Sequence, residues 1–173
     1  EVTITVVDDP DVNAFALPGN RIVVLRGLID TAKDGDELAG ILAHESAHLA
    51  HLDPVVGVIR NVGLSAIAHS LGMGGALAPK LGTRMLSLAY SRSVEARADR
   101  SAAAYLHAAG LRADGLARFF TRLQQLQGSD ILPAFLSDHP PLAQRKTKMA
   151  DDAAGVAALS PREWAAIRSM CGR

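Results

Sequence analysis

Hydrophobic and polar positions alternate near the start of the chain and then change to a helical spacing. Residues 2–7 alternate and are rich in β-branched side chains, which predicts a half-buried strand. Residues 13–17 and 21–26 predict two further strands joined by a tight turn at residues 18–20. From about residue 34 the apolar side chains return on one helical face, which predicts a long helix. We therefore expect an α+β fold in which a small antiparallel sheet precedes a mainly helical part.

Helical patterns continue through the rest of the chain. An Ala-rich helix is expected from about Thr83 to His107, and Gly110 just beyond it is a typical helix stop. Apolar residues at core spacing predict another helix: Leu116, Phe119, Phe120, Leu123 and Leu126. A polar helix is expected after residues 140–141, which are both proline. Residues 160–163 form a capping box that predicts the start of a terminal helix.

The long helix near residue 34 contains the sequence His44-Glu45-Ser46-Ala47-His48. Positions four apart share a helical face, so His44 and His48 can hold one metal ion with Glu45 beside it. Zinc with three protein ligands keeps a fourth position for a water molecule and lowers its pKa. Glu45 would take the proton of that water and pass it to a leaving amine. The alternative is an amphipathic helix with histidines on its polar side, but the apolar periodicity and a capping box before the motif favour the metal site.

A zinc site needs a third protein ligand. The other glutamates have roles of their own, as a terminal residue, in helix caps or as the expected base: Glu1, Glu37, Glu163 and Glu45. Glu95 remains, and Asp99 lies four residues on, where it could hold a ligand histidine by its other ring nitrogen. The alternative for Glu95 is a salt bridge with Arg92 or Arg97. Three histidines are the alternative third ligands: His51, His69 and His107.

Composition excludes several other classes of protein. The formal net charge is zero and no basic block is present, so neither nucleic acid nor an anionic membrane is indicated as a partner. The single cysteine, Cys171, excludes an internal disulfide framework. No apolar run has transmembrane length and no signal peptide is visible. Because residue 1 is Glu rather than Met, we expect a processed or trimmed chain.

Length and pattern together predict one domain over residues 1–173. Within it we expect the small sheet at residues 1–30, metal-binding helices at 31–110 and a helical C-terminal part at 111–173. Residues 54–82 are apolar and rich in glycine. The favoured interpretation is a helix and loop packed over the metal helix, and the alternative is a mobile lid or a surface that contacts lipid or a partner.

Four segments in order resemble the gluzincin peptidases of the family that contains the CAAX prenyl proteases and the HtpX heat-shock proteases. They are most similar to the compact, soluble bacterial members of that family. The segments are residues 13–28, 44–48, 90–99 and 137–145. Asn20 stands where the family more often has Gly, a difference that turn geometry tolerates.

The resemblance implies one zinc ion per chain and a set of site residues. The implied ligands are His44, His48 and Glu95, the general base is Glu45, and the supporting residues are Asp99 and Arg145. The resemblance also implies that His139 lies near the metal. There it would donate to the developing oxyanion, which we favour because a hydrolase needs an open zinc position. The alternative is that it occludes the zinc as a further ligand.

The implied function is zinc-dependent hydrolysis of peptide bonds by an endopeptidase in protein quality control. Unfolded or membrane-associated proteins are the implied substrates, and the cell envelope or periplasm is the implied location. We expect the strand before the metal helix to be an exposed edge that pairs with substrate backbone through Asn13, Ala14, Phe15 and Ala16. The alternative function is a chaperone-like assembly factor or holdase with little proteolysis. A third possibility is hydrolysis of a non-peptide amide.

Overall fold

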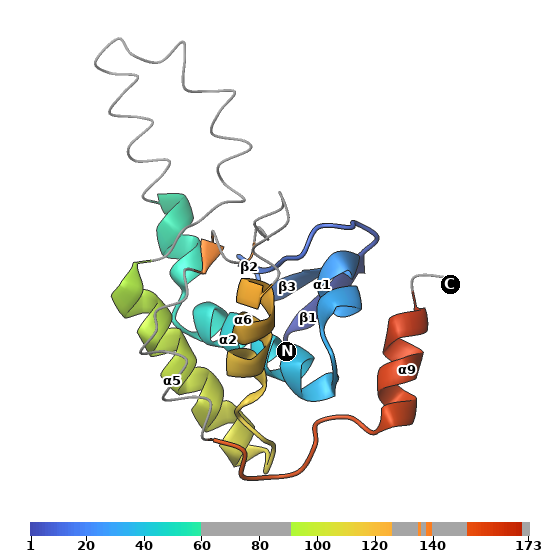
Figure 1. The fold of residues 1–173 in the computed structure, drawn as a ribbon. Coiled ribbons are helices and arrows are strands. Elements are labelled where there is room, and N and C mark those ends of the chain that lie inside the picture. Colours follow the sequence, from blue (N-terminus) through green and yellow to red (C-terminus); the bar gives the residue numbers. More distant parts are fainter. Residues whose placement is uncertain (60–90, 126–134, 136–137, 140–151, 171–173) are drawn as a thin grey trace, which may run out of the picture.

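The computed structural model describes residues 1–59, 91–125, 135, 138–139 and 152–170 (Figure 1). Predictions for the remaining residues, among them those on His69, Arg145 and the polar helix after residue 140, lie outside the described part. Along the described chain a small sheet comes first and helices follow. The expected α+β class is therefore confirmed. None of the described helices combines the length and apolar character that crossing a membrane requires.

The sheet has three strands, β1 (Thr3–Val7), β2 (Ala14–Leu17) and β3 (Arg21–Leu25), in the order β1-β3-β2. A tight turn with positive φ at Gly19 and Asn20 reverses the chain, so β2 and β3 pair antiparallel as expected. Strand β3 lies between β1 and β2 and runs parallel to β1. The sheet is therefore mixed, and the expectation of a wholly antiparallel sheet is wrong for this pair.

Burial in the sheet follows the alternation of side chains along the strands. Ala14 and Ala16 of β2 and their partners on β3, Val24 and Ile22, are all buried. In β1 only Val6 is even partly buried, so the expectation of a half-buried strand is wrong. The reason is position, because β1 is an edge strand that pairs with β3, whereas α2 packs against β2 and β3.

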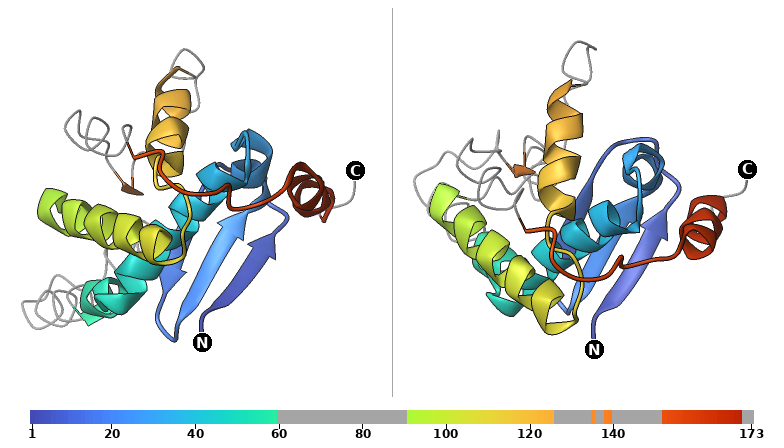
Figure 2. Two further views of the ribbon diagram at one scale, coloured as in Figure 1. Left: turned by 90° about the horizontal axis from the view of Figure 1, so that it is seen from below. Right: turned by 60° about the horizontal axis from the view of Figure 1, so that its bottom comes forward.

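Five labelled helices follow the sheet: α1 (Arg26–Thr31), α2 (Gly35–Ala50), α5 (Arg92–Ala108), α6 (Gly115–Gln125) and α9 (Pro161–Ser169). Helix α2 packs against the sheet, α5 and α6, and both views in Figure 2 show it between the sheet and α5. Helix α9 lies on the opposite side of the molecule from α5 (Figure 2). Helix α2 is thus the element against which strands β2 and β3, α5 and α6 pack.

The N-terminal end of α2 is fixed by a cap and by buried charges. Asp34 accepts a hydrogen bond from the Glu37 backbone N–H at 3.0 Å. The Glu37 side chain does not complete a capping box, because its carboxylate accepts from the Lys33 backbone at 2.8 Å and pairs with Arg122 of α6 at 2.6 Å. Helix α6 also approaches closely, since a Cβ on its Gly115 would overlap the backbone of α2.

The ends of the other helices agree with the sequence patterns in part. Helix α5 begins after Ser91, an extended N-cap residue, so the helix expected from Thr83 to His107 does not run through Ser91, and residues 83–90 lie outside the described part. It ends before Gly110, which has a φ of +72° and confirms the expected stop. The capping box at the start of α9 is confirmed, with Ser160 and Glu163 bonding each other's backbone.

Candidate metal centre

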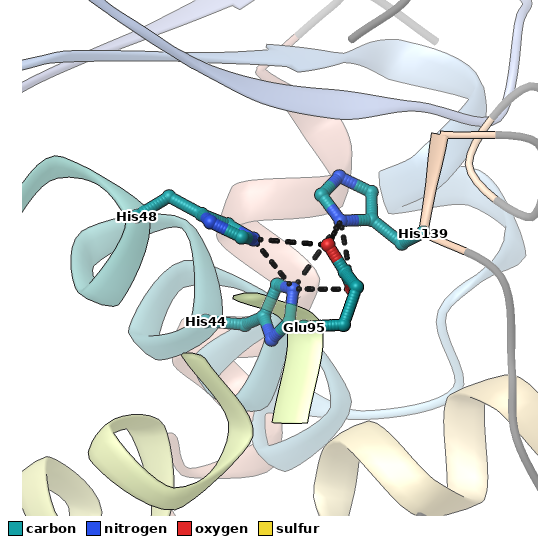
Figure 3. A group of neighbouring side chains, drawn as sticks. All are labelled: His44, His48, Glu95 and His139. Atoms are coloured by element: carbon teal, nitrogen blue, oxygen red, sulfur yellow. Dashed lines mark hydrogen bonds and ion pairs between the residues drawn. The ribbon is translucent and has the colours of Figure 1, made fainter. Parts of the chain in front are cut away.

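Four buried side chains from three parts of the chain converge at one point (Figure 3). His44 and His48 come from α2, and Glu95 comes from the first turn of α5. His139 lies between α6 and α9 in the sequence. One donor atom from each of the four lies within 4.8 Å of the others. A cluster of three imidazoles and one carboxylate, fully removed from solvent, is a set of ligands suited to a metal ion.

The spacing of the two motif histidines and Glu95 fits a tetrahedral ion. The Nε2 atoms of His44 and His48 are 3.1 Å apart. The two oxygens of Glu95 lie 3.4 Å from His44 Nε2 and 3.4 Å from His48 Nε2. Ligands held at about 2.0–2.1 Å from zinc in a tetrahedral arrangement are separated by ~3.3–3.4 Å. These separations place the donor atoms of the three residues close enough to share one metal ion.

His139 lies at the same spacing as these three residues. Its Nδ1 is 3.3 Å from His44 Nε2 and 3.2 Å from Glu95 Oε1. The imidazole ring packs against the Phe135 ring with centroids 4.9 Å apart. The backbone N–H of His139 donates to the Phe135 carbonyl at 2.9 Å. The resemblance anticipated a histidine near the metal here, whereas local pattern indicated only a loop residue before two prolines.

Glu45 faces the same centre from α2. One carboxylate oxygen, Oε2, accepts a hydrogen bond from the Ala16 backbone N–H of β2 at 2.9 Å. The other oxygen, Oε1, is buried, accepts no hydrogen bond from the described residues and lies 3.4 Å from His139 Nε2. A buried carboxylate oxygen without a donor, directed at the centre, can accept a proton from a substrate or water.

A carboxylate stands behind each motif histidine. Asp99 of α5 lies 3.0 Å from His44 Nδ1, the arrangement predicted from its position four residues after Glu95. Asp53 lies 3.0 Å from His48 Nδ1 and also pairs with Arg97 at 2.5 Å. Such partners orient a ligand imidazole and increase its basicity. In the sequence, Asp53 precedes Pro54, a pattern that indicates only the end of a helix. In the fold, Asp53 reaches His48 because the chain turns at residues 51–52 and a short helix begins at residue 53.

We expect Asp53→Asn to lower the affinity for zinc by about 10–100-fold, because the neutral amide orients His48 without increasing its basicity. Competition with a fluorescent chelator measures the change. Asp152→Asn is the matched control, since Asp152 pairs with His107 at 2.8 Å on the surface. Equal zinc affinities for the two variants would show that Asp53 does not support the site.

The charges in this centre stabilise one another when no metal is bound. Burial alone would raise the pKa of Glu95, but hydrogen bonds from His139, His44 and His48 outweigh burial and hold that pKa well below its usual range. Burial would likewise lower the pKa of His44, yet the carboxylates of Asp99 and Glu95 raise it to about 9. The cluster is thus arranged for a positive charge at the position of the expected ion.

The other histidines considered as ligands lie elsewhere. His51 Nε2 is 3.3 Å from the Ser101 hydroxyl and does not belong to the cluster. His107 is at the surface with Asp152. His69, like Arg145, falls outside the described residues. Of the alternatives to Glu95 as a third ligand, therefore, neither described histidine reaches the centre.

Strand β2 borders the centre but is not the exposed edge that was expected. Ala14 is fully buried and Ala16 is 6% exposed, whereas Phe15 is partly buried. The N–H of Ala14 donates to the side chain of Asn13 at 2.9 Å, and the N–H of Ala16 donates to Glu45. The strand is covered because these side chains, rather than solvent, meet its outer edge.

Comparison with known proteins relates this arrangement to a family. The profile described as Peptidase family M48 matches residues 1–152. Metalloendopeptidase OMA1, mitochondrial, of Bos taurus is 33% identical over 154 residues, which cover 79% of this chain and 29% of the relative. Metalloprotease LoiP of Escherichia coli is 31% identical over 149 residues, which cover 82% of this chain and 58% of the relative. The putative beta-barrel assembly-enhancing protease of Vibrio cholerae is 30% identical over 153 residues, which cover 80% of this chain and 32% of the relative. The chain thus spans only 29% to 58% of the length of these relatives.

Proposed function

Since the chain belongs to peptidase family M48, we propose that it is a zinc-dependent endopeptidase that hydrolyses peptide bonds with an activated water molecule. The observation that carries this proposal is the buried oxygen Glu45 Oε1, which accepts no hydrogen bond from the described residues and borders a complete set of metal donors. A protein that only binds other proteins, such as a holdase, does not require a carboxylate beside a metal cluster, so this arrangement favours the enzyme. Imidazole and carboxylate donors at tetrahedral spacing favour zinc over harder cations, which prefer oxygen alone.

Each residue of the centre has a distinct role in the proposed reaction. His44, His48 and Glu95 hold the ion, and Asp99 and Asp53 orient the two imidazoles. When bound, zinc supplies a Lewis acid and lowers the pKa of a coordinated water to about 7. Glu45 accepts the proton of the attacking water at Oε1 and passes it to the nitrogen of the leaving amine. Arg145, which the resemblance implies as a supporting residue, remains part of the proposal.

Strand β2 is the proposed docking edge for an extended peptide. The Leu25 N–H donates to the Asn13 carbonyl at 3.0 Å, so the alternating residues Ala14 and Ala16 direct their N–H groups away from β3. Those groups face Asn13 and Glu45 instead. A substrate strand would replace these contacts with main-chain pairing and lie directly over the metal centre. Residues 13–16 would thus bind substrate.

The distances around His139 support the second of its two candidate roles. Its Nδ1 lies at ligand spacing from both His44 and Glu95, which favours a fourth ligand over the oxyanion donor preferred from sequence. A fourth protein ligand occupies the position that a hydrolase needs for water, so the protein would rest in a self-inhibited state.

We expect His139→Ala to raise peptide turnover about 10-fold or more. If His139 leaves the water position in ~10% of the molecules or fewer, removing it makes all of them active, and turnover rises by the reciprocal of that fraction. The same variant should lose zinc to a chelator faster, because one ligand is gone. Steady-state cleavage of a fluorogenic peptide measures the first effect. A fall in turnover of ~10²–10³-fold would instead show that His139 is the oxyanion donor.

Zinc binding should release protons at neutral pH. The raised pKa of His44, about 9, means that its imidazole is protonated at pH 7 in the metal-free protein. A metal ligand must give up that proton, so the affinity for zinc should rise with pH until about pH 9 and then level off. Calorimetric titration at pH 7 in buffers of different ionisation enthalpy should show ~one proton released per zinc. No proton release would contradict a protonated His44.

The wider biological role is proposed by analogy with relatives. Within the family, the motifs at residues 44–48 and 90–99 resemble those of the CAAX prenyl proteases and HtpX heat-shock proteases. The bovine relative is named as mitochondrial, and the Vibrio relative as a beta-barrel assembly-enhancing protease. The name of the Vibrio relative supports a cell-envelope location for this chain. Unfolded or membrane-associated polypeptides, the substrates that the resemblance implies, are part of the same proposal.

Digestion of casein with and without a chelator tests the proposed activity. The wild type and His139→Ala should both lose activity when zinc is removed and recover it when zinc is restored. Casein that stays intact with both zinc-loaded proteins, together with suppressed aggregation of a heat-labile globular protein, would favour the holdase.

A further inference from the structure

The side chain of Asn13 joins the proposed docking strand to the residue before His139. Its Nδ2 donates to Asp138 Oδ2 at 3.0 Å, and its Oδ1 accepts from the Ala14 N–H at 2.9 Å. Asn13 is 6% exposed and Asp138 is 7% exposed. A buried carboxylate is costly unless it accepts hydrogen bonds, so this contact stabilises Asp138 where it is.

A second contact attaches the same short segment to the residues just before β2. The Phe135 N–H donates to the Val12 carbonyl at 3.2 Å. The N–H of His139 then donates to the Phe135 carbonyl, and the two rings pack together. The backbone that carries His139 is therefore held at Phe135 by Val12 and at Asp138 by Asn13.

The contacts form a closed ring beside the metal centre. His139 Nε2 lies 3.4 Å from Glu45 Oε1, and Glu45 Oε2 accepts from the Ala16 N–H. From Ala16 the strand leads back to Asn13, and from Asn13 the ring returns through Asp138 to His139. The outer edge of β2, the general base and the imidazole at the ligand position thus share one network.

We propose that Asn13 and Asp138 are positioning residues that hold His139 at the metal and couple its position to the occupancy of strand β2. The proposal rests on the proposed function for the identity of β2 as the docking edge. A peptide that pairs with the Ala14 N–H must displace Asn13 Oδ1, and the same amide then loses its alignment with Asp138. Substrate docking would in this way weaken the hold on His139.

Zinc transfer to an excess of chelator, in the absence of any peptide, tests the positioning role. Asn13→Ala and Asp138→Ala should each speed transfer about 10-fold, because a loosened His139 no longer retains the ion. Neither change should speed transfer further when made in the His139→Ala background, since both residues act through His139. Cobalt substituted for zinc should show a changed visible absorption in the two single variants, because water would replace one imidazole donor.

Conservative variants separate positioning from folding. Asp138→Asn keeps an acceptor oxygen for Asn13 and should transfer zinc at nearly the wild-type rate. Asn13→Asp places two carboxylates together and should speed transfer, whereas the exchanged pair, Asn13→Asp with Asp138→Asn, restores one donor and one acceptor and should recover slow transfer. Circular dichroism confirms that each variant is folded.

Equal acceleration by Asn13→Ala in the wild-type and His139→Ala backgrounds would overturn the proposal, because it would show a general structural effect. Unchanged transfer in Asn13→Ala and Asp138→Ala would overturn it as well, as would a folded protein that takes up no zinc. Because no substrate is present, a positive result stands even if the protein cleaves no peptide, in which case only the proposed activity fails.

Discussion

Glu45→Gln will lower the rate of peptide hydrolysis at least ~10²-fold while leaving the zinc content unchanged. The amide is nearly isosteric with the carboxylate, and its oxygen can still accept the Ala16 N–H that Glu45 accepts at 2.9 Å. Its nitrogen then replaces Oε1, the atom that accepts no hydrogen bond from the described residues. An amide nitrogen cannot accept the proton of water, so the chemical step fails although the structure is preserved.

Glu163→Gln is the matched control for Glu45→Gln. Glu163 is exposed and caps α9, where an amide oxygen can replace the carboxylate that accepts the Ser160 N–H. Both substitutions should be made in the wild type and in His139→Ala, so that self-inhibition does not hide the effect. A folded, zinc-loaded Glu45→Gln protein that retains its turnover would remove Glu45 from the mechanism.

The second large effect is expected from the third ligand. Glu95→Ala should weaken zinc binding by more than ~10²-fold, beyond the effect of losing a supporting carboxylate, because a direct ligand is lost. Glu95 is fully buried, and its two oxygens lie 3.4 Å from the Nε2 atoms of His44 and His48. Zinc content after dialysis against a weak chelator, measured by atomic emission, should fall as it does in His44→Ala.

His51→Ala is the control for this assignment. His51 is the C-cap residue of α2, just after the motif, but it contacts Ser101 rather than the cluster. Its removal should leave the zinc content unchanged. Full zinc in Glu95→Ala together with loss of zinc in His51→Ala would show that the ligand set is wrong.

Most of the centre follows from local pattern because its geometry is helical. His44 and His48 meet because they are four residues apart on α2, and Asp99 reaches His44 because it follows Glu95 by one turn. The caps of α2 and α9 are short-range as well, so Asp34 and Ser160 could be recognised in the sequence.

Features that depend on chain reversals and tertiary contacts could not be predicted in the same way. Asp53 reaches His48 only because the chain turns at residues 51–52, where Leu52 has a φ of +56°. The position of His139 depends on the contacts of its neighbours Asp138 and Phe135 with the residues just before β2, more than 100 residues away in sequence. Glu37 has a capping spacing, yet its carboxylate accepts from the Lys33 backbone rather than from Asp34 and pairs with Arg122 of α6, a tertiary contact that neutralises the buried charge.

The burial of β2 has the same kind of origin. Its sequence indicates an edge strand, and in the sheet it is one. Whether the outer edge is open depends on Glu45 and Asn13, which lie on it from outside the strand. Alternation along a strand specifies which side chains face the core, but it carries no information about what meets the backbone N–H groups.

The central claim is that this chain is a metallopeptidase whose activity depends on one ion held by His44, His48 and Glu95. Titrating zinc into the metal-free protein while recording peptide cleavage tests it most directly, with the wild type and His139→Ala run side by side. We predict that cleavage rises with added zinc in at least one of the two proteins, is higher in His139→Ala, and stops rising at one equivalent. Cleavage that is present without metal, or absent from both proteins with one zinc bound, would contradict the claim.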